Sequence, residues 1–180
     1  MVCDRCIKVV KEELEKLGHK IEHIELGEVL LKKAPTQKQL LQIKEVLEVN
    51  GFSLLEDSKK QTIEQIKNLI INKIHYSKDP MNTGFSKLIE NKLHKDYTTL
   101  SKMFSSVENI TIEHFVILQK IEKVKELLRY GELTLSEIAY KLGYNSVNHL
   151  SSQFKKHTGL TATQFKETTT LSRNPLDKVN

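Results

Sequence analysis

The chain has 180 residues, 28% of them charged, and a mean hydropathy of −0.40, values typical of a soluble globular protein with one or two small domains. No apolar run exceeds four residues, so we expect neither a membrane span nor a secretory signal, and a cytoplasmic location. Acidic and basic residues balance over the first sixty positions, so the net charge of +5 comes from residues 61–180. Such an excess would attract a polyanionic partner, although charge alone favours an ordinary solvated lysine face, and only the repeat described below supports the polyanion.

The first sixty residues alternate between helical and strand periodicity. Apolar residues at helical spacing predict a helix over 7–17, and alternation around a glycine predicts a β-hairpin over 21–33. A second helix is expected over 35–50 and a short strand over 52–55. Helix, two strands, helix and strand is the order of a ferredoxin-like fold that lacks its first strand, so we predict such a module over residues 1–57.

Two cysteines, Cys3 and Cys6, form a CxxC motif at the start of the first predicted helix. A helix amino terminus stabilises thiolates, and two thiolates suit a soft ion such as Cu(I). The motif and the element order resemble heavy-metal-associated domains, the ferredoxin-like copper chaperone fold, which implies metal binding at both cysteines. Because two cysteines cannot complete a tetrahedral zinc site within one chain, a redox site and a vestigial module used for packing or dimerisation remain alternatives.

Residues 56–61 are polar and predict a linker, and a second domain of helices is expected over 62–167. A loop is expected over 78–83, and the tail 168–180 is expected to be frayed. The helices of this domain are predicted from apolar spacing, from Gly131 as a terminator and from the capping box of Thr134 and Glu137. They span about 62–75, 85–93, 97–107, 112–130, 134–142 and 146–157.

Two stretches fifty residues apart repeat one pattern, LSKMFSSVENITIEHF over Leu100–Phe115 and LSSQFKKHTGLTATQF over Leu150–Phe165. Leucine, serine, phenylalanine, threonine and phenylalanine recur in register. In each stretch a leucine and a phenylalanine four residues apart form an apolar helical stripe, and a shorter helix precedes it across a tight turn. The repeat therefore predicts a duplicated helix-turn-helix that lays two recognition helices on DNA.

Residues 133–166 (LTLSEIAYKLGYNSVNHLSSQFKKHTGLTATQFK) closely resemble the signature of AraC/XylS-type transcriptional regulators. The matching positions are Leu135, Ile138, Ala139, Leu142, Gly143, Tyr144, Leu150, Phe154, Lys155, Gly159 and Phe165. The resemblance extends more weakly back to Thr62. It implies two helix-turn-helix units joined by the helix over 112–130, so that the two recognition helices enter successive major grooves of DNA.

The first helix-turn-helix motif departs from this pattern at three positions. Glu90 stands where the second motif has Ala139, and His94 stands where it has Gly143. These residues predict a looser first motif that chiefly contacts the DNA backbone. Asn109 replaces the glycine after the recognition helix, and asparagine tolerates left-handed geometry nearly as well.

The outward faces of the two recognition helices supply the candidate DNA contacts. With Leu150 and Phe154 assigned to the core, the residues left to meet bases are Val147, Asn148, Ser151 and Ser152, with Asn148 suited to adenine and Val147 to a thymine methyl. The flanking residues suited to phosphates are His149, Gln153, Lys155 and Lys156. The outward set in the first helix is Thr98, Ser101 and Lys102, with Lys102 a candidate for guanine. Each polar residue also fits an ordinary solvated helix position.

The sequence as a whole predicts an α+β chain, a small ferredoxin-like module followed by an all-α double helix-turn-helix domain. Its leading function is a sequence-specific DNA-binding transcription regulator, with double-stranded DNA as partner and a second copy of the chain and RNA polymerase as further candidates. The alternative is a thiol-based metal-binding protein whose helices serve assembly. A thiol-disulfide enzyme shares the CxxC but lacks the expected βαβ context. The chain has no glycine-rich phosphate loop, HExxH helix or nucleophile elbow, so we do not expect an enzyme.

Overall fold

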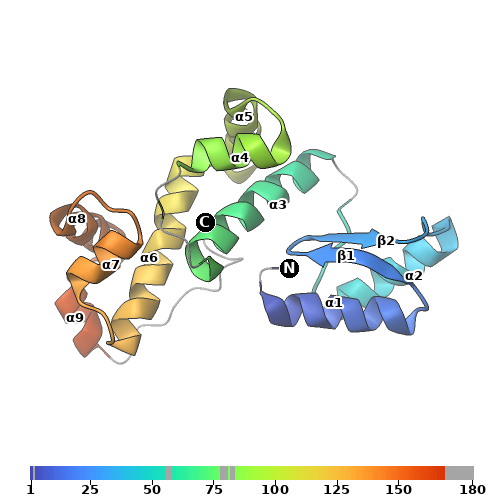
Figure 1. Cartoon of the computed structure of the whole chain (residues 1–180), viewed down its shortest axis with the longest axis horizontal. Helices are drawn as coiled ribbons and strands as arrows, with labels where there is room; N and C mark the ends of the chain where they lie inside the picture. The colour runs from blue at the N-terminus through green and yellow to red at the C-terminus, as the bar shows by residue number, and fades with distance from the viewer. Residues whose placement is uncertain (2, 56–57, 78–80, 82–83, 169–180) are drawn as a thin grey trace. The chain divides into compact units, whose positions relative to one another are not determined.

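The structure is a computed structural model that describes residues 1, 3–55, 58–77, 81 and 84–168 (Figure 1). Most of the loop predicted over 78–83, and all of the tail beyond residue 168, lie outside the described residues. The chain forms two compact units, with the boundary between Asn68 and Leu69. Within the described residues, no helix has the length and apolar character needed to cross a membrane.

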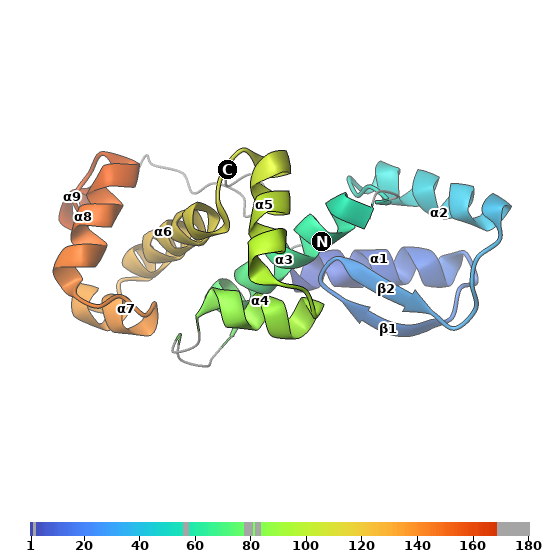
Figure 2. The same ribbon diagram turned by 90° about the horizontal axis from the view of Figure 1, so that it is seen from above.

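The first unit contains the helices and the hairpin that the sequence predicts. Its elements are α1 (Asp4–Lys16), β1 (Ile21–Glu25), β2 (Glu28–Leu31) and α2 (Gln37–Val49). The two strands pair antiparallel, and the apolar faces of α1 and α2 pack together with them around a common core (Figure 2). The most buried residues of this core are Val10, Leu14, Ile43 and Leu47. The apolar spacing therefore located these elements correctly.

The third strand predicted over residues 52–55 is wrong, because that stretch has no regular secondary structure. The backbone N–H of Phe52 donates to the carbonyl of Leu47 at 2.8 Å and so closes the end of α2. Phe52 and Leu54 still pack against the core of the unit, which explains their apolar character without a strand. The sheet of the described residues has two strands, and the predicted ferredoxin-like fold is not confirmed.

The polar stretch over 56–61 is not a linker throughout, because α3 (Ser58–Ile71) begins at Ser58. The side chain of Asn68 in α3 donates from Nδ2 to the carbonyl of Leu26 at 3.2 Å, next to the hairpin turn. At that turn Gly27 has a φ of +84°, and an added Cβ would lie 2.1 Å from Asn68 Nδ2. The positive φ therefore favours glycine at this turn, and the Asn68 side chain ties α3 to the hairpin.

A π-helical turn, η1 (Asn72–Tyr76), follows α3 where the sequence predicts the last turn of an α-helix. The wider turn is closed by the N–H of Ser77, which donates to the carbonyl of Asn72 at 3.0 Å. Ring atom Nε2 of His75 lies 3.0 Å from Oε1 of the buried Gln119, and Lys123 Nζ donates to the carbonyl of His75 at 3.3 Å. Polar contacts thus hold η1 against the long helix that carries Gln119 and Lys123.

The second unit is helical, and its predicted helices over 85–93 and 112–130 have the bounds of the observed ones. The elements that follow η1 are α4 (Phe85–Leu93), α5 (Tyr97–Glu108), α6 (Ile112–Tyr130), α7 (Leu135–Lys141), α8 (Val147–Thr158) and α9 (Ala162–Glu167). Helices α7, α8 and α9 gather around the carboxy-terminal part of α6, and α4 and α5 lie at its other end (Figure 1). The helix α9 was not among the predicted elements. Its start is marked by a capping box in which Thr161 and Gln164 bond reciprocally.

Candidate nucleic-acid interface

Helices α5 and α8 begin and end in the same way, which extends the sequence repeat to the backbone. The Asp96 side chain accepts the N–H of Thr99 at 2.9 Å before α5, and Ser146 Oγ accepts the N–H of His149 at 3.1 Å before α8. Each N-cap satisfies an otherwise free helix donor. The helices end in the left-handed region, at Asn109 (φ 59°) and at a glycine with φ 76°. The predicted geometry of Asn109 is confirmed.

The repeated leucines and phenylalanines of both recognition helices are core residues, as predicted. Leu100, Phe104, Leu150 and Phe154 have 0% exposure. The apolar stripe of each helix faces inward, so its opposite face is free to meet a ligand.

The turn before α8 is fixed by close backbone packing. Gly143 has a φ of +65°, and a Cβ there would lie 3.0 Å from the carbonyl oxygen of Met81. The next N–H, of Tyr144, donates to the carbonyl of Ala139 at 2.9 Å. Helix α7 starts at the predicted capping box, where hydrogen bonds from Thr134 lower the pKa of Glu137. A local capping box thus fixes the start of α7, and close packing against Met81 restricts the turn that leads into α8.

The turn before α5 reaches the same geometry with different residues. His94 has a φ of 51° at the position equivalent to Gly143. The carboxylate of Glu90 accepts the N–H of Tyr97 at 2.9 Å, so it bonds to the start of the recognition helix. The Tyr97 hydroxyl donates to Glu113 in α6 at 2.5 Å, and this bond lowers the pKa of Glu113. Glu90, which the sequence predicts to loosen the first motif, therefore joins α4 to α5.

The residues predicted to contact DNA from α8 differ in exposure. Those on the surface are Asn148, His149, Ser152, Lys155 and Lys156. Val147, Ser151 and Gln153 are half-buried, and Val147 packs against the core of the second motif. In α5, Thr98 and Lys102 are exposed and Ser101 is half-buried. The helix therefore presents Asn148 and Ser152 more openly than Val147.

The sequence between Glu137 and Glu167 contains no acidic residue, and its lysines are all exposed: Lys141, Lys155, Lys156 and Lys166. Two of them lie in the last turn of α8, where the helix dipole favours cations. In the same turn the ring of His157 meets that of His114 with centroids 5.6 Å apart. Burial, and then the charges of His114 and Lys156, lower the pKa of His157.

Tyr144, which precedes α8, has a role that the sequence analysis did not assign. Its hydroxyl donates to Oε1 of Gln153 at 2.7 Å, its ring meets the His149 ring edge-on at 5.5 Å, and Lys120 Nζ lies 5.0 Å above the ring centroid. Burial lowers the pKa of Lys120 and raises that of Tyr144. Helical spacing shows that positions 149 and 153 share a face, but no local pattern joins them to Lys120, which comes from α6.

The CxxC cysteines lie together at the start of α1. Cys3 is the N-cap residue and Cys6 lies in the first turn, and their sulfur atoms are 3.2 Å apart. Both residues are half-buried. Among the described residues, no three His, Cys, Asp or Glu side chains are grouped so that they could hold a metal ion. The pair suits a soft ion that accepts two ligands, or a disulfide, better than a tetrahedral ion.

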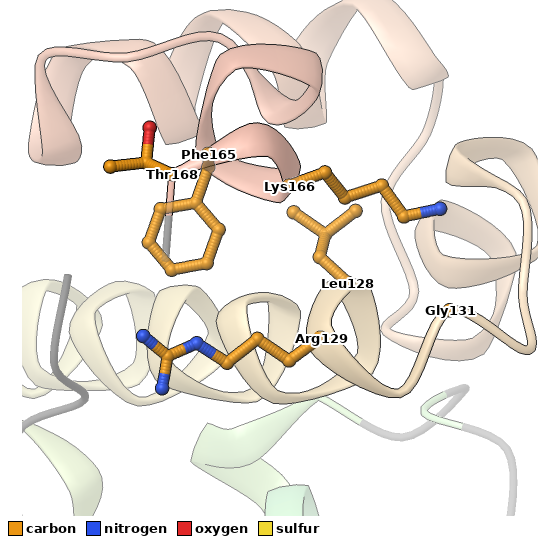
Figure 3. A pocket seen from close by; sticks show the side chains of 6 residues that line it. All are labelled: Leu128, Arg129, Gly131, Phe165, Lys166 and Thr168. Atoms are coloured by element: carbon orange, nitrogen blue, oxygen red, sulfur yellow. The ribbon is translucent and has the colours of Figure 1, made fainter. Parts of the chain in front are cut away.

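A hollow of about 420 Å³ lies between α6 and α9 (Figure 3). Leu128 and Phe165 form its apolar part, and the guanidinium of Arg129 lies 5.7 Å from the centroid of the Phe165 ring. The charged ends of Arg129 and Lys166 point to opposite sides in Figure 3. The two cations therefore do not converge on one anion.

Comparison with known proteins agrees with this geometry. The family described as "Helix-turn-helix domain" matches residues 89–168, the region that contains both helix-turn-helix motifs. The C-terminal domain of AraT, a response regulator from Geobacillus stearothermophilus, is similar in structure, with a TM-score of 0.50 and 25% sequence identity over 68% of this chain and 94% of that one.

An uncharacterised HTH-type transcriptional regulator in the cgkA 5′ region of Pseudoalteromonas carrageenovora is 39% identical over 69 residues. The matched stretch is 38% of this chain and spans 40% of the length of that relative. The similarity to this relative therefore concerns one region of each protein.

Proposed function

We propose that this chain is a sequence-specific, DNA-binding transcription regulator of the AraC type. The observation that carries the proposal is the pair of equivalent helices, α5 and α8, with matching caps and buried Leu–Phe stripes. Each leaves a polar face for double-stranded DNA, and α6 joins the two helix-turn-helix motifs as one continuous helix. The proposal places the protein in the cytoplasm, with a second copy of the chain and RNA polymerase as further partners.

The two helices have different roles in this proposal. Helix α8 contacts bases through Asn148 and Ser152, with Val147 and Ser151 at the inner edge of the contact, and contacts phosphates through its flanking residues His149, Gln153, Lys155 and Lys156. Helix α5 contributes Thr98, Ser101 and Lys102, chiefly against the backbone. The absence of acidic residues from Ile138 to Lys166 supports this assignment, because a polyanion meets no repelling side chain along that stretch of sequence.

A fluorescence-anisotropy titration of the full chain against promoter fragments and random DNA at several salt concentrations tests the proposal. We expect tighter binding to a subset of promoter fragments, and an affinity that falls linearly with salt on logarithmic axes. Equal affinity for every fragment would remove sequence specificity, and binding that does not depend on salt would remove the phosphate contacts.

A second function, a response to a soft metal ion or to oxidation, is supported by the 3.2 Å separation of the Cys3 and Cys6 sulfur atoms. We propose that the reduced pair binds one Cu(I) per chain. Titration of Cu(I) against a competing chelator should give this stoichiometry, and Cys3→Ser or Cys6→Ser should abolish it. Ser53→Ala, at an exposed position of the same unit, is the control. Unchanged copper binding by both cysteine variants would eliminate the metal function without affecting DNA binding.

A further inference from the structure

Tyr144 lies where three elements meet in the second helix-turn-helix motif. Its backbone is tied to α7 through Ala139, its hydroxyl bonds to Gln153 in α8, and Lys120 of α6 lies over its ring. The residue is half-buried and packs against the core of the motif. The phenol group is therefore held by contacts that do not involve DNA.

The bond from Tyr144 determines what Gln153 can offer a ligand. A glutamine amide has an oxygen that accepts and a nitrogen that donates. The hydroxyl donates to Oε1 at 2.7 Å, which leaves the NH₂ group as the part that can bond elsewhere. Bidentate recognition of adenine requires both halves of the amide. A phosphate oxygen only accepts, so a donor suffices.

The position of Gln153 agrees with this chemistry. Gln153 and His149 are four residues apart and lie on one side of α8, and both contact Tyr144. Gln153 is adjacent in sequence to Ser152, which is exposed on the face proposed to contact bases. The NH₂ group thus belongs to the flank of the recognition helix, where backbone contacts fix its register on the duplex.

We propose that Tyr144 is a positioning residue that orients the Gln153 amide so that its NH₂ group donates to a DNA phosphate. The inference rests on the proposed DNA binding, in which Gln153 contacts phosphate, and adds the residue that orients its amide for that contact. It assigns Gln153 to the placement of α8 in the groove, and base discrimination to its neighbours Asn148 and Ser152.

The test uses anisotropy titrations of the full chain with the tightest-binding promoter fragment and with single-base variants of that fragment. Gln153→Ala should weaken binding to all of these fragments by about the same factor, roughly tenfold for one hydrogen bond to a charged group. Its salt slope should match that of the wild type, because a neutral donor releases no counterion. Lys155→Ala is the matched comparison, and its slope should fall by about 0.9.

Tyr144→Phe keeps the ring and removes only the hydroxyl, so it should reproduce part of the loss seen in Gln153→Ala. The double variant Tyr144→Phe, Gln153→Ala should bind no more weakly than Gln153→Ala alone, because the hydroxyl acts through the amide. Circular dichroism melting should show that each variant remains folded, and the side-chain NH₂ signal of Gln153 in a ¹⁵N NMR spectrum should shift when DNA is added. That signal reports the contact even if the Phe variant loses stability.

Two results would overturn the inference. One is a Gln153→Ala loss that disappears for fragments altered at one particular base pair, which would make Gln153 a base-contacting residue. The other is an additive loss in the double variant, which would make Tyr144 independent of Gln153. Both results require a wild-type protein that binds DNA, so they are distinct from failure of DNA binding itself.

Discussion

The ring of Phe154 in α8 meets the ring of Phe165 in α9 edge-on, with centroids 5.5 Å apart. The edge-to-face contact places the positive rim of one ring against the negative face of the other. Fifty residues earlier, Phe104 and Phe115 form the corresponding pair at 5.7 Å, with their rings tilted by 60°. Each pair joins a recognition helix to the helix that follows it, so the repeat conserves the contact that holds the helix in place.

We therefore expect Phe154→Ala to be strongly destabilising. The side chain has no exposed surface, and its removal leaves a cavity beside Phe165, so the free energy of unfolding should fall by about 3–5 kcal/mol. Urea unfolding followed by circular dichroism measures this loss. Tyr140→Ala is the control, because Tyr140 is 85% exposed, and it should change stability by less than about 0.5 kcal/mol. Equal effects of the two changes would contradict the assigned core.

The repeat could be predicted from sequence because its determinants are local. Leucine and phenylalanine four residues apart, the N-cap at Thr111 and the turn at Asn109 each act within a few residues of one another. The sequence wrongly predicts a strand over residues 52–55. Phe52 and Leu54 are apolar because they pack against the core of the first unit, a contact that local sequence does not reveal. The contacts of Tyr144 were missed for the same reason, since Lys120 comes from a distant helix.

His94→Gly should stabilise the second unit. His94 adopts a left-handed backbone conformation, which costs an L-residue roughly 1–2 kcal/mol and glycine almost nothing. Part of that gain is lost because glycine is more flexible in the unfolded chain. We expect about 0.5–1 kcal/mol of added stability in thermal unfolding. The reciprocal change, Gly143→Ala, should destabilise, because its Cβ would press on the Met81 carbonyl. A loss of stability in His94→Gly would show that the imidazole makes contacts that outweigh the backbone cost.

His114→Asn should raise the pKa of His157. Burial is the larger cause of the lowered pKa and the charge of His114 is the next, so the variant should recover part of the shift only. An NMR titration of the His157 ring measures this directly, and Lys156→Gln, which removes the third cause, should give a smaller rise. An unchanged pKa in His114→Asn would mean that the two rings do not interact in solution.

The sign of the associated pH effect follows from the lowered pKa. The folded state binds the His157 proton less readily than the unfolded state does, so protonation favours unfolding. The contribution to stability is complete above the unfolded pKa, about 6.5, and is lost as the pH falls through the lower folded value. His157→Gln should flatten the stability profile in that range, and a profile that stays as steep would assign the dependence to other groups.

Asn148→Ala and Lys155→Ala should weaken DNA binding in different ways, because both side chains are exposed on α8 but differ in chemistry. An asparagine that bonds bidentately to adenine contributes roughly 1–3 kcal/mol of discrimination at one base pair. Its loss should reduce affinity for the preferred sequence while leaving binding to random DNA unchanged. The lysine acts on phosphate and should weaken all sequences alike. Lys38→Ala, in the first unit, removes the same charge from an exposed helix position and should have little effect. Uniform losses in both α8 variants would show that Asn148 does not contact a base, and a loss in Lys38→Ala of the same size would show that binding follows net charge rather than the face of α8.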